Sequence, residues 1–366
     1  MDYISTRDTS EVPRSISSAQ AIKTGIAPDG GLFMPTEIPH LAPGDIEKLC
    51  AMPYSERAAY ILSMFLTDYD RDGLRADCAE AYSEERFPSS PAPVVSLGAG
   101  IYSLELWHGP TCAFKDMALQ IMPRLLSRAL SMTQERKLAH ILVATSGDTG
   151  KAALEGFCDV PGVKITVFYP CDGVSPMQKR QMITQKGDNV FVSAVRGNFD
   201  DAQTGVKKIF ANPDYARRAE EEGFFFSSAN SINWGRLAPQ IVYYISAYCD
   251  LVKENEIFEG DVVNVCVPTG NFGNIFAAYL AREMGLPLGK LICASNSNCV
   301  LTDFIESGEY DRTREFYKTM SPSMDILVSS NLERLLYVIG GPSLASSCMN
   351  ELSYLLLGKT DRERMK

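Results

Sequence analysis

The sequence lacks the features that identify most zinc-binding, membrane-spanning and secreted proteins. None of its ten cysteines forms a CxxC pair, and the three histidines (His40, His108 and His140) never fall at zinc-ligand spacing. No apolar run approaches the roughly 20 residues that a transmembrane helix needs, and the polar start MDYISTRDTSEV shows no signal-peptide pattern. We therefore expect no metal and no membrane, and a cytoplasmic protein with reduced, mostly buried thiols.

The chain also has fewer basic than acidic residues. The chain has 35 Lys and Arg against 45 Asp and Glu, which gives a formal net charge of -10. Nucleic acids and anionic membranes favour clustered Lys and Arg, so neither is expected as a partner, although a single cleft can still be basic. The 366 residues, of which 45% are hydrophobic, are enough for two or three globular domains.

Strand and helix patterns alternate through most of the chain after residue 93. Amphipathic patterns, typical of helices, cover 116–130, 241–252 and 275–284, and their order among short apolar runs predicts an α/β fold with largely parallel sheets. The runs expected to form buried strands are 140–145, 164–170, 189–195, 262–268 and 290–295. The first ninety residues are instead rich in proline and turns, with one helix expected near 54–66.

Lys115 stands in a segment suited to covalent chemistry. The run HGPTCAFKD (108–116) brings this lysine to the start of the helix predicted at 116–130. An ammonium there faces the positive end of the helix dipole, which favours the neutral, nucleophilic amine. A lysine of this kind can form a Schiff base. The alternative is an ordinary surface lysine at a helix start.

Two glycine-rich turns each follow a predicted strand and open a predicted helix. They are TSGDTG (145–150) and PTGNFGN (268–274). Small residues and free amides at a helix start suit a phosphate or carboxylate. The alternative is plain helix capping or close packing. The second turn lacks the lysine of a Walker loop and does not match GxGxxG, so a nucleotide site is not indicated.

A third polar segment is SANSINWGRL (228–237). It places Asn230, Asn233 and Arg236 around Trp234, one of only two tryptophans. Arg236 could pair with a phosphate or carboxylate through two hydrogen bonds, or lie on the surface. Lys179 and Arg180 are better explained as a solvated helix face.

Taken together, these segments resemble threonine synthase, a fold-type II pyridoxal-phosphate (PLP) enzyme. The resemblance rests on HGPTCAFKD, TSGDTGKAAL, NSINWGRLAPQ and VPTGNFGN in this order, on YISTRD and APDGGLFMP near the start, and on 292–312 and 321–335. It implies two αβα domains with parallel sheets, as in the β-subunit of tryptophan synthase, plus an N-terminal segment. The implied boundaries are 1–90 for that segment, 91–120 with 230–366 for a large cofactor-binding domain, and 121–229 for a small domain.

The resemblance also implies roles for single residues. The lysine of the FKD motif, here Lys115, bonds PLP covalently. The GNFGN loop binds the cofactor phosphate, and the SGDTG loop holds the substrate carboxylate. These loops supply Gly270, Asn271, Phe272, Gly273 and Asn274 for the cofactor, and Ser146, Asp148 and Thr149 for the substrate. Asn233 and Arg236 are expected near the substrate phosphate.

The implied reaction converts O-phospho-L-homoserine and water to L-threonine and phosphate, by elimination at Cγ and addition at Cβ, in a monomer or homodimer. The chain stops at Lys366, before the usual end of this family, and no residue is assigned to face the pyridine nitrogen. Two alternatives therefore stay open. One is another fold-type II lyase or dehydratase, and the other is a truncated, non-catalytic relative.

Overall fold

The largest sheet among the described residues has four parallel strands. The structure is a computed structural model that describes residues 1–145, 147–197, 199–350 and 354–356. The strand order in this sheet is β8-β7-β6-β9. The strands are β6 (Leu138–Ala144), β7 (Val163–Pro170), β8 (Val190–Val195) and β9 (Phe224–Ser227). The predicted runs 140–145, 164–170 and 189–195 are thus confirmed as parallel strands.

Both faces of this sheet are covered by helices. Ile141 and Val143 of β6 belong to the main core, together with the buried face of α7 (Asp148–Phe157). Leu142 and Ala144 point to the opposite face and pack with α9 (Phe199–Ala211) in a smaller cluster. This two-sided burial explains why the strand reads as a continuous apolar run and not as an alternating one.

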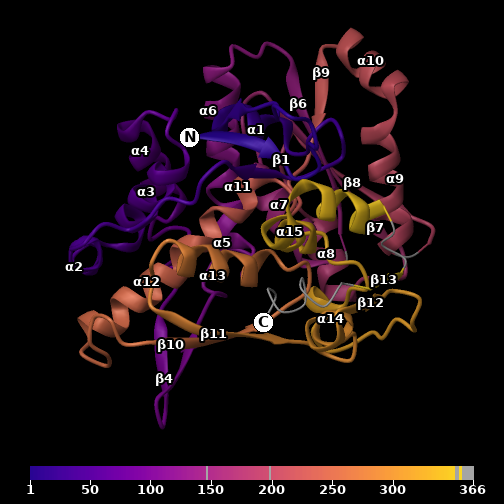
Figure 1. The fold of residues 1–366 in the computed structure, drawn as a ribbon. Coiled ribbons are helices and arrows are strands. Elements are labelled where there is room, and N and C mark those ends of the chain that lie inside the picture. The colour runs from indigo at the N-terminus through magenta and orange to yellow at the C-terminus, as the bar shows by residue number, and fades with distance from the viewer. Residues whose placement is uncertain (146, 198, 351–353, 357–366) are drawn as a thin grey trace.

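A second parallel pair lies apart from the first sheet (Figure 1). It consists of β10 (Val263–Pro268) and β11 (Leu288–Ala294), which confirms that 262–268 and 290–295 form parallel strands. The expected burial is wrong for this pair and for β8, since Cys266, Ile292 and Phe191 are exposed. Helix α13 (Gly273–Glu283) connects the two strands, and α12 (Pro239–Lys253) packs against α13. These helices match the patterns at 275–284 and 241–252.

The N-terminal segment is a small antiparallel sheet followed by helices. Its strands are β1 (Asp2–Ser5), β2 (Ile16–Ser17) and β3 (Phe33–Pro35), and its helices are α1 (Ser18–Thr24), α2 (Asp45–Cys50), α3 (Tyr54–Phe65) and α4 (Arg71–Ala81). The helix expected near 54–66 is confirmed as α3. The remaining elements are β4 (Val94–Gly98), β5 (Ile101–Leu104), α8 (Pro176–Ile183), α10 (Pro213–Glu221), α11 (Trp234–Leu237), α14 (Val300–Ser307), β12 (Glu309–Asp311), the 3-10 turn η1 (Pro322–Met324), α15 (Leu332–Asn350) and β13 (Tyr354–Leu356).

The single helix predicted at 116–130 is wrong. The structure has α5 (Asp116–Leu119) and α6 (Met122–Met132), separated by a break. Pro123 lacks an N–H group and its ring clashes with the carbonyl four residues earlier, so a continuous helix cannot pass through it. The freed Leu119 carbonyl lies against α7, where a Cβ on Gly156 would come within 2.1 Å of it.

The thiols are less buried than expected. None of the ten cysteines forms a disulfide bond in the described part of the chain, but only Cys78, Cys249 and Cys348 are buried, and Cys112 and Cys266 are exposed. Among the described residues there is no group of three or more His, Cys, Asp or Glu placed to hold a metal ion. No helix in the described part of the chain is both long and apolar enough to cross a membrane.

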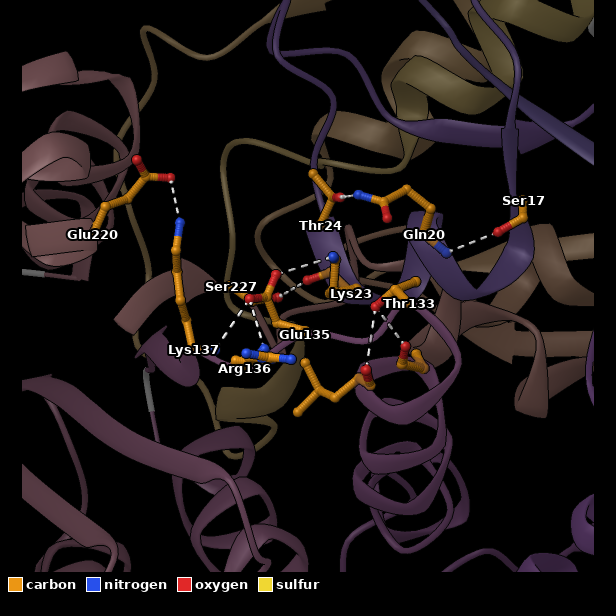
Figure 2. Close-up of polar contacts among 12 residues, drawn as sticks. Ser17, Gln20, Lys23, Thr24, Thr133, Glu135, Arg136, Lys137, Glu220 and Ser227 are labelled. Carbon is orange, nitrogen blue, oxygen red and sulfur yellow. Dashed lines mark hydrogen bonds and ion pairs between the residues drawn. The ribbon is translucent and has the colours of Figure 1, made fainter. Parts of the chain in front are cut away.

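Polar contacts attach α1 to the edge of the four-stranded sheet (Figure 2). Lys23 Nζ lies 3.2 Å from Glu135 Oε2, and Glu135 Oε1 accepts from the amides of Arg136 and Lys137 at 3.1 Å each. Ser227, at the end of β9, donates to the Lys23 carbonyl at 2.8 Å. The N-terminal segment is therefore fixed directly to the strands that lead into the 228–237 segment.

Glu333 of α15 makes a second attachment of the N-terminal segment to the rest of the chain, and replacing Glu333 tests it. Its buried carboxylate accepts from Thr6 Oγ1 at 2.6 Å and from Arg7 Nε and Nη2 at 2.9 and 2.7 Å. Because Glu333→Ala leaves these donors without an acceptor, we expect it to lower the free energy of unfolding by about 3 kcal/mol in urea titrations. Glu80→Ala, which removes an exposed partner of Arg124, is the control and should cost less than about 1 kcal/mol. Equal effects of the two variants would contradict the attachment.

Candidate functional site

The turns after β6 and β10 meet at one cavity that is partly open to solvent. Seven of the expected site residues line it, namely Lys115, Thr149, Arg236, Gly270, Asn271, Gly273 and Asn274. Ligands of α/β proteins gather where strands end and helices begin, which is the position of this cavity. Ser146 lies outside the described residues.

Lys115 faces this cavity and not the solvent. It precedes the first residue of α5, and its side chain is only 11% exposed. Its Nζ donates to Asp148 Oδ1 at 2.7 Å. The preceding turn is held by Asp116, whose carboxylate accepts from the Thr111 amide at 2.8 Å and from the Thr111 hydroxyl at 2.7 Å. The surface-lysine interpretation is therefore excluded.

Asp148 begins α7 and is surrounded by donors. Besides Lys115, its carboxylate accepts from the Thr149 amide at 2.8 Å and from the Ser323 hydroxyl. Burial raises the pKa of Asp148, but the charge of Lys115 and the hydrogen bonds from Lys115, Ser323 and the Thr149 amide outweigh it, so the pKa lies below its usual value. A carboxylate fixed in this way keeps its negative charge beside the Lys115 amine at neutral pH.

The turn at 270–274 presents free backbone donors. Phe272 adopts a left-handed conformation (φ 64°) just before α13 begins at Gly273. Among the residues that the structure describes, no acceptor takes a hydrogen bond from the N–H groups of 270–274. The Asn274 side chain closes the turn by donating to the Pro268 carbonyl at 2.7 Å. Unpaired amides at a helix start form a receptor for an anion such as phosphate.

Arg236 brings a buried positive charge to the same cavity. The residue is 3% exposed, which excludes a surface position. Its Nη1 donates to the Ala229 carbonyl, while its Nε has no partner among the described residues. Burial lowers its pKa to about 10, against the opposing charges of Asp148 and Asp116. It is therefore a cation at neutral pH that no carboxylate contacts directly within the described chain, and such a group suits an anionic ligand.

Asn233 does not lie where the sequence led us to expect. It is fully buried, and its Nδ2 donates to the carbonyls of Ile22 and Ser228, both at 2.9 Å. Its Oδ1 accepts from the Gly235 amide at 2.9 Å and so caps α11. Asn233 is absent from the cavity wall, and both of its N–H groups are already used, so it has no donor left for a substrate phosphate.

Several residues of the cavity wall carried no site assignment from the sequence. They are Phe114, Asn230, Ser231, Gln240, Ser323 and Met324. Gln240 follows Arg236 by four residues and donates to its carbonyl at 3.0 Å, so helical periodicity could have identified it. Ser323 gave no local signal, since only the tertiary fold brings η1 to Asp148.

Comparison with known proteins gives consistent matches over nearly the whole chain. Residues 2–82 match the model for the threonine synthase N terminus, and residues 84–339 match that for pyridoxal-phosphate dependent enzymes. Threonine synthase from Pseudomonas aeruginosa is 40% identical, over 93% of this chain and 69% of its own length. The crystal structure of PLP-bound threonine synthase from Brucella melitensis superposes with a TM-score of 0.88 at 36% identity, over 100% of this chain and 76% of that one.

A human protein named threonine synthase-like 1 is also similar. It is 46% identical over 88% of this chain, but the match covers only 44% of the human protein. The chain thus spans about half the length of such curated relatives.

Proposed function

Because the chain belongs to the threonine synthase family of pyridoxal-phosphate dependent enzymes, we propose that it converts O-phospho-L-homoserine and water to L-threonine and phosphate. One observation carries the proposal: the Lys115 amine, the free amides of 270–274 and the Arg236 cation all line one cavity. An amine, an anion receptor and a second positive charge are what a phosphorylated aldehyde cofactor and a phosphorylated substrate need.

The residues of this cavity fit PLP. The amides of 270–274 would hold its phosphate, and Lys115 would bond its aldehyde carbon. When bound, the cofactor would withdraw electrons from the substrate Cα and stabilise the negative charge that proton removal leaves there. The buried Nε of Arg236, which lacks a partner, supports a role for this residue toward the substrate phosphate.

Lys115 would move the protons. Once its amine is released, it would take one proton from the substrate Cα and one from Cβ, which lets phosphate leave Cγ. It would then return one proton to Cγ before water adds at Cβ and one to Cα afterwards, while the remaining proton of the water leaves with the phosphate. Asp148 would hold the amine between these steps through the 2.7 Å contact. A second carboxylate would be repelled by Asp148, so the Thr149 hydroxyl is better suited to the substrate carboxylate.

A product assay tests the proposal against its alternatives. The PLP-loaded protein is incubated with O-phospho-L-homoserine, and threonine, 2-oxobutanoate and phosphate are measured. We expect threonine and phosphate in equal amounts. Phosphate with 2-oxobutanoate and no threonine would identify another lyase of this fold type. PLP binding without phosphate release would identify a non-catalytic relative.

The contact between Lys115 and Asp148 can be tested without the cofactor. Asp148→Asn removes the carboxylate to which the Lys115 amine donates, which leaves the amine freer to react, so we expect trace acetylation of Lys115 to rise about tenfold. Labelling is read by mass spectrometry of the peptide that contains Lys115. Glu155→Gln is the matched control, because Glu155 pairs with Lys151 at 2.9 Å, and it should change the labelling of Lys151 only. Unchanged labelling of Lys115 in Asp148→Asn would exclude the positioning role.

We also propose a cytoplasmic location and a monomeric or homodimeric state. The lack of disulfide bonds among the described cysteines supports a reducing compartment. Cell fractionation and sedimentation equilibrium measure the two properties.

A further inference from the structure

The carbonyl oxygens of the phosphate-binding turn are held from behind by a segment that the proposed reaction does not use. Ser329 Oγ donates to the Gly270 carbonyl at 2.9 Å. Asn331 donates twice to the Asn271 carbonyl, from its backbone amide at 3.1 Å and from Nδ2 at 2.9 Å. Both Ser329 and Asn331 are fully buried.

These contacts determine where the turn's amides point. In a planar trans peptide unit, the N–H lies on the side opposite the C=O. Fixing the carbonyls of Gly270 and Asn271 toward Ser329 and Asn331 therefore directs the amides of Asn271 and Phe272 the other way. These are amides for which the described chain offers no acceptor.

Asn331 is itself held rigidly. Its Nδ2 also donates to Ser231 Oγ at 3.1 Å, and its Oδ1 accepts from Arg334 Nη1. Arg334 is fully buried and donates through Nη2 to the carbonyls of Phe33 at 3.1 Å and Ile232 at 2.7 Å. Burial lowers the pKa of Arg334 to about 9, so it keeps its charge at neutral pH. The arginine thus joins the N-terminal segment to the asparagine that supports the turn.

The backbone of the 270–274 turn is closely packed on two sides. A Cβ on Gly273 would lie 3.2 Å from Asn331 Nδ2, and one on Gly270 would lie 3.2 Å from the Met324 Cα. The glycines therefore let Asn331 on one side and η1 on the other approach the backbone closely. Contacts on both sides therefore restrict the conformation of the turn.

We propose that Ser329 and Asn331, backed by Arg334, are positioning residues that aim the amides of the 270–274 turn at the phosphate of the cofactor. The proposal rests on the function proposed above, in which this turn receives that phosphate. The proposal adds that the preference for pyridoxal 5'-phosphate over pyridoxal depends on side chains that make no contact with the cofactor.

The test compares the dissociation constants of pyridoxal 5'-phosphate and of pyridoxal, which lacks the phosphate, by absorbance titration of the full chain. Their ratio isolates the contribution of the turn. We expect Asn331→Ala to reduce the ratio about tenfold and Ser329→Ala, which loses one hydroxyl and is the milder change, about threefold. The matched control is Asn189→Ala. Asn189 Nδ2 also donates to two carbonyls, those of Phe157 at 2.8 Å and Val163 at 3.0 Å, outside the turn. It should lose stability while keeping the wild-type ratio.

The outcomes separate this proposal from the function on which it rests. Asn271→Asp places a negative charge at the turn and should lower the ratio whatever holds the carbonyls. If it lowers the ratio while Asn331→Ala and Ser329→Ala match Asn189→Ala, the positioning role is overturned and the phosphate site stands. If the wild-type protein shows no preference for the phosphorylated form, the phosphate site itself is overturned, and the positioning role with it.

Discussion

Replacement of Lys115 by alanine is expected to reduce threonine formation from O-phospho-L-homoserine by about 10⁴-fold. The reason is that one amine would serve both as the covalent attachment for the cofactor and as the acid and base of the reaction. The amine lies in the cavity, 2.7 Å from Asp148, and no other lysine lines that cavity in the described chain. Phosphate release under steady-state conditions measures the loss.

Lys151→Ala provides the control for this result. Lys151 belongs to the same loop-helix region, but its ammonium bonds Glu155 at 2.9 Å on the flank of α7. It should keep activity within a few-fold of wild type. A Lys115→Ala protein that is folded, retains PLP and still forms threonine at a tenth of the wild-type rate would contradict the assignment.

Replacement of Arg236 by methionine is expected to weaken substrate binding with little effect on stability. The change removes a buried charge that contacts no carboxylate directly in the described chain, but it also removes the donor to the Ala229 carbonyl, so the free energy of unfolding of the empty protein should change by less than about 1 kcal/mol. The same change removes the cation available to the substrate phosphate, so KM should rise about 100-fold. Urea titration and initial-rate kinetics measure the two effects.

Arg57→Met is the matched control for Arg236→Met. Arg57 is equally buried, but it is paired with Asp250 at 2.6 Å and bonded to Ser246 Oγ at 2.8 Å. Because its loss leaves buried acceptors without a donor, Arg57→Met should destabilise the protein without raising KM. If Arg236→Met destabilised the protein as strongly and left KM unchanged, Arg236 would be structural.

The pH dependence of substrate affinity should follow from the ionisation of Arg236. Burial lowers the pKa of Arg236 to about 10, so the cation is present below that pH and is lost above it. Substrate affinity should therefore fall as the pH rises through about 10. In Arg236→Met this fall should be absent.

The sequence was sufficient to predict what depends on local patterns. The strands were identifiable because each forms a short apolar run. In β6 the run is continuous because both faces are covered, whereas β8, β10 and β11 each leave residues exposed. The two glycine turns were identifiable because each joins a strand to a helix. Their convergence on Lys115 followed from the rule that ligands gather at such junctions.

What the sequence could not reveal depends on contacts between distant segments. Asn233 looked like a binding residue because it lies in a polar run, yet its partner Ile22 is 211 positions away. Ser323 and Asp148 are 175 positions apart, and neither local sequence indicates the other. The support of the 270–274 turn by Asn331 is equally invisible without the fold. Only the break at Pro123 was a local signal that the helical periodicity concealed.

Finding which lysine bonds the cofactor tests the role of Lys115 without relying on activity. The PLP-loaded protein is reduced with borohydride, digested and mapped by mass spectrometry. We expect a pyridoxyl adduct on the peptide that contains Lys115. An adduct confined to any other lysine would contradict this role.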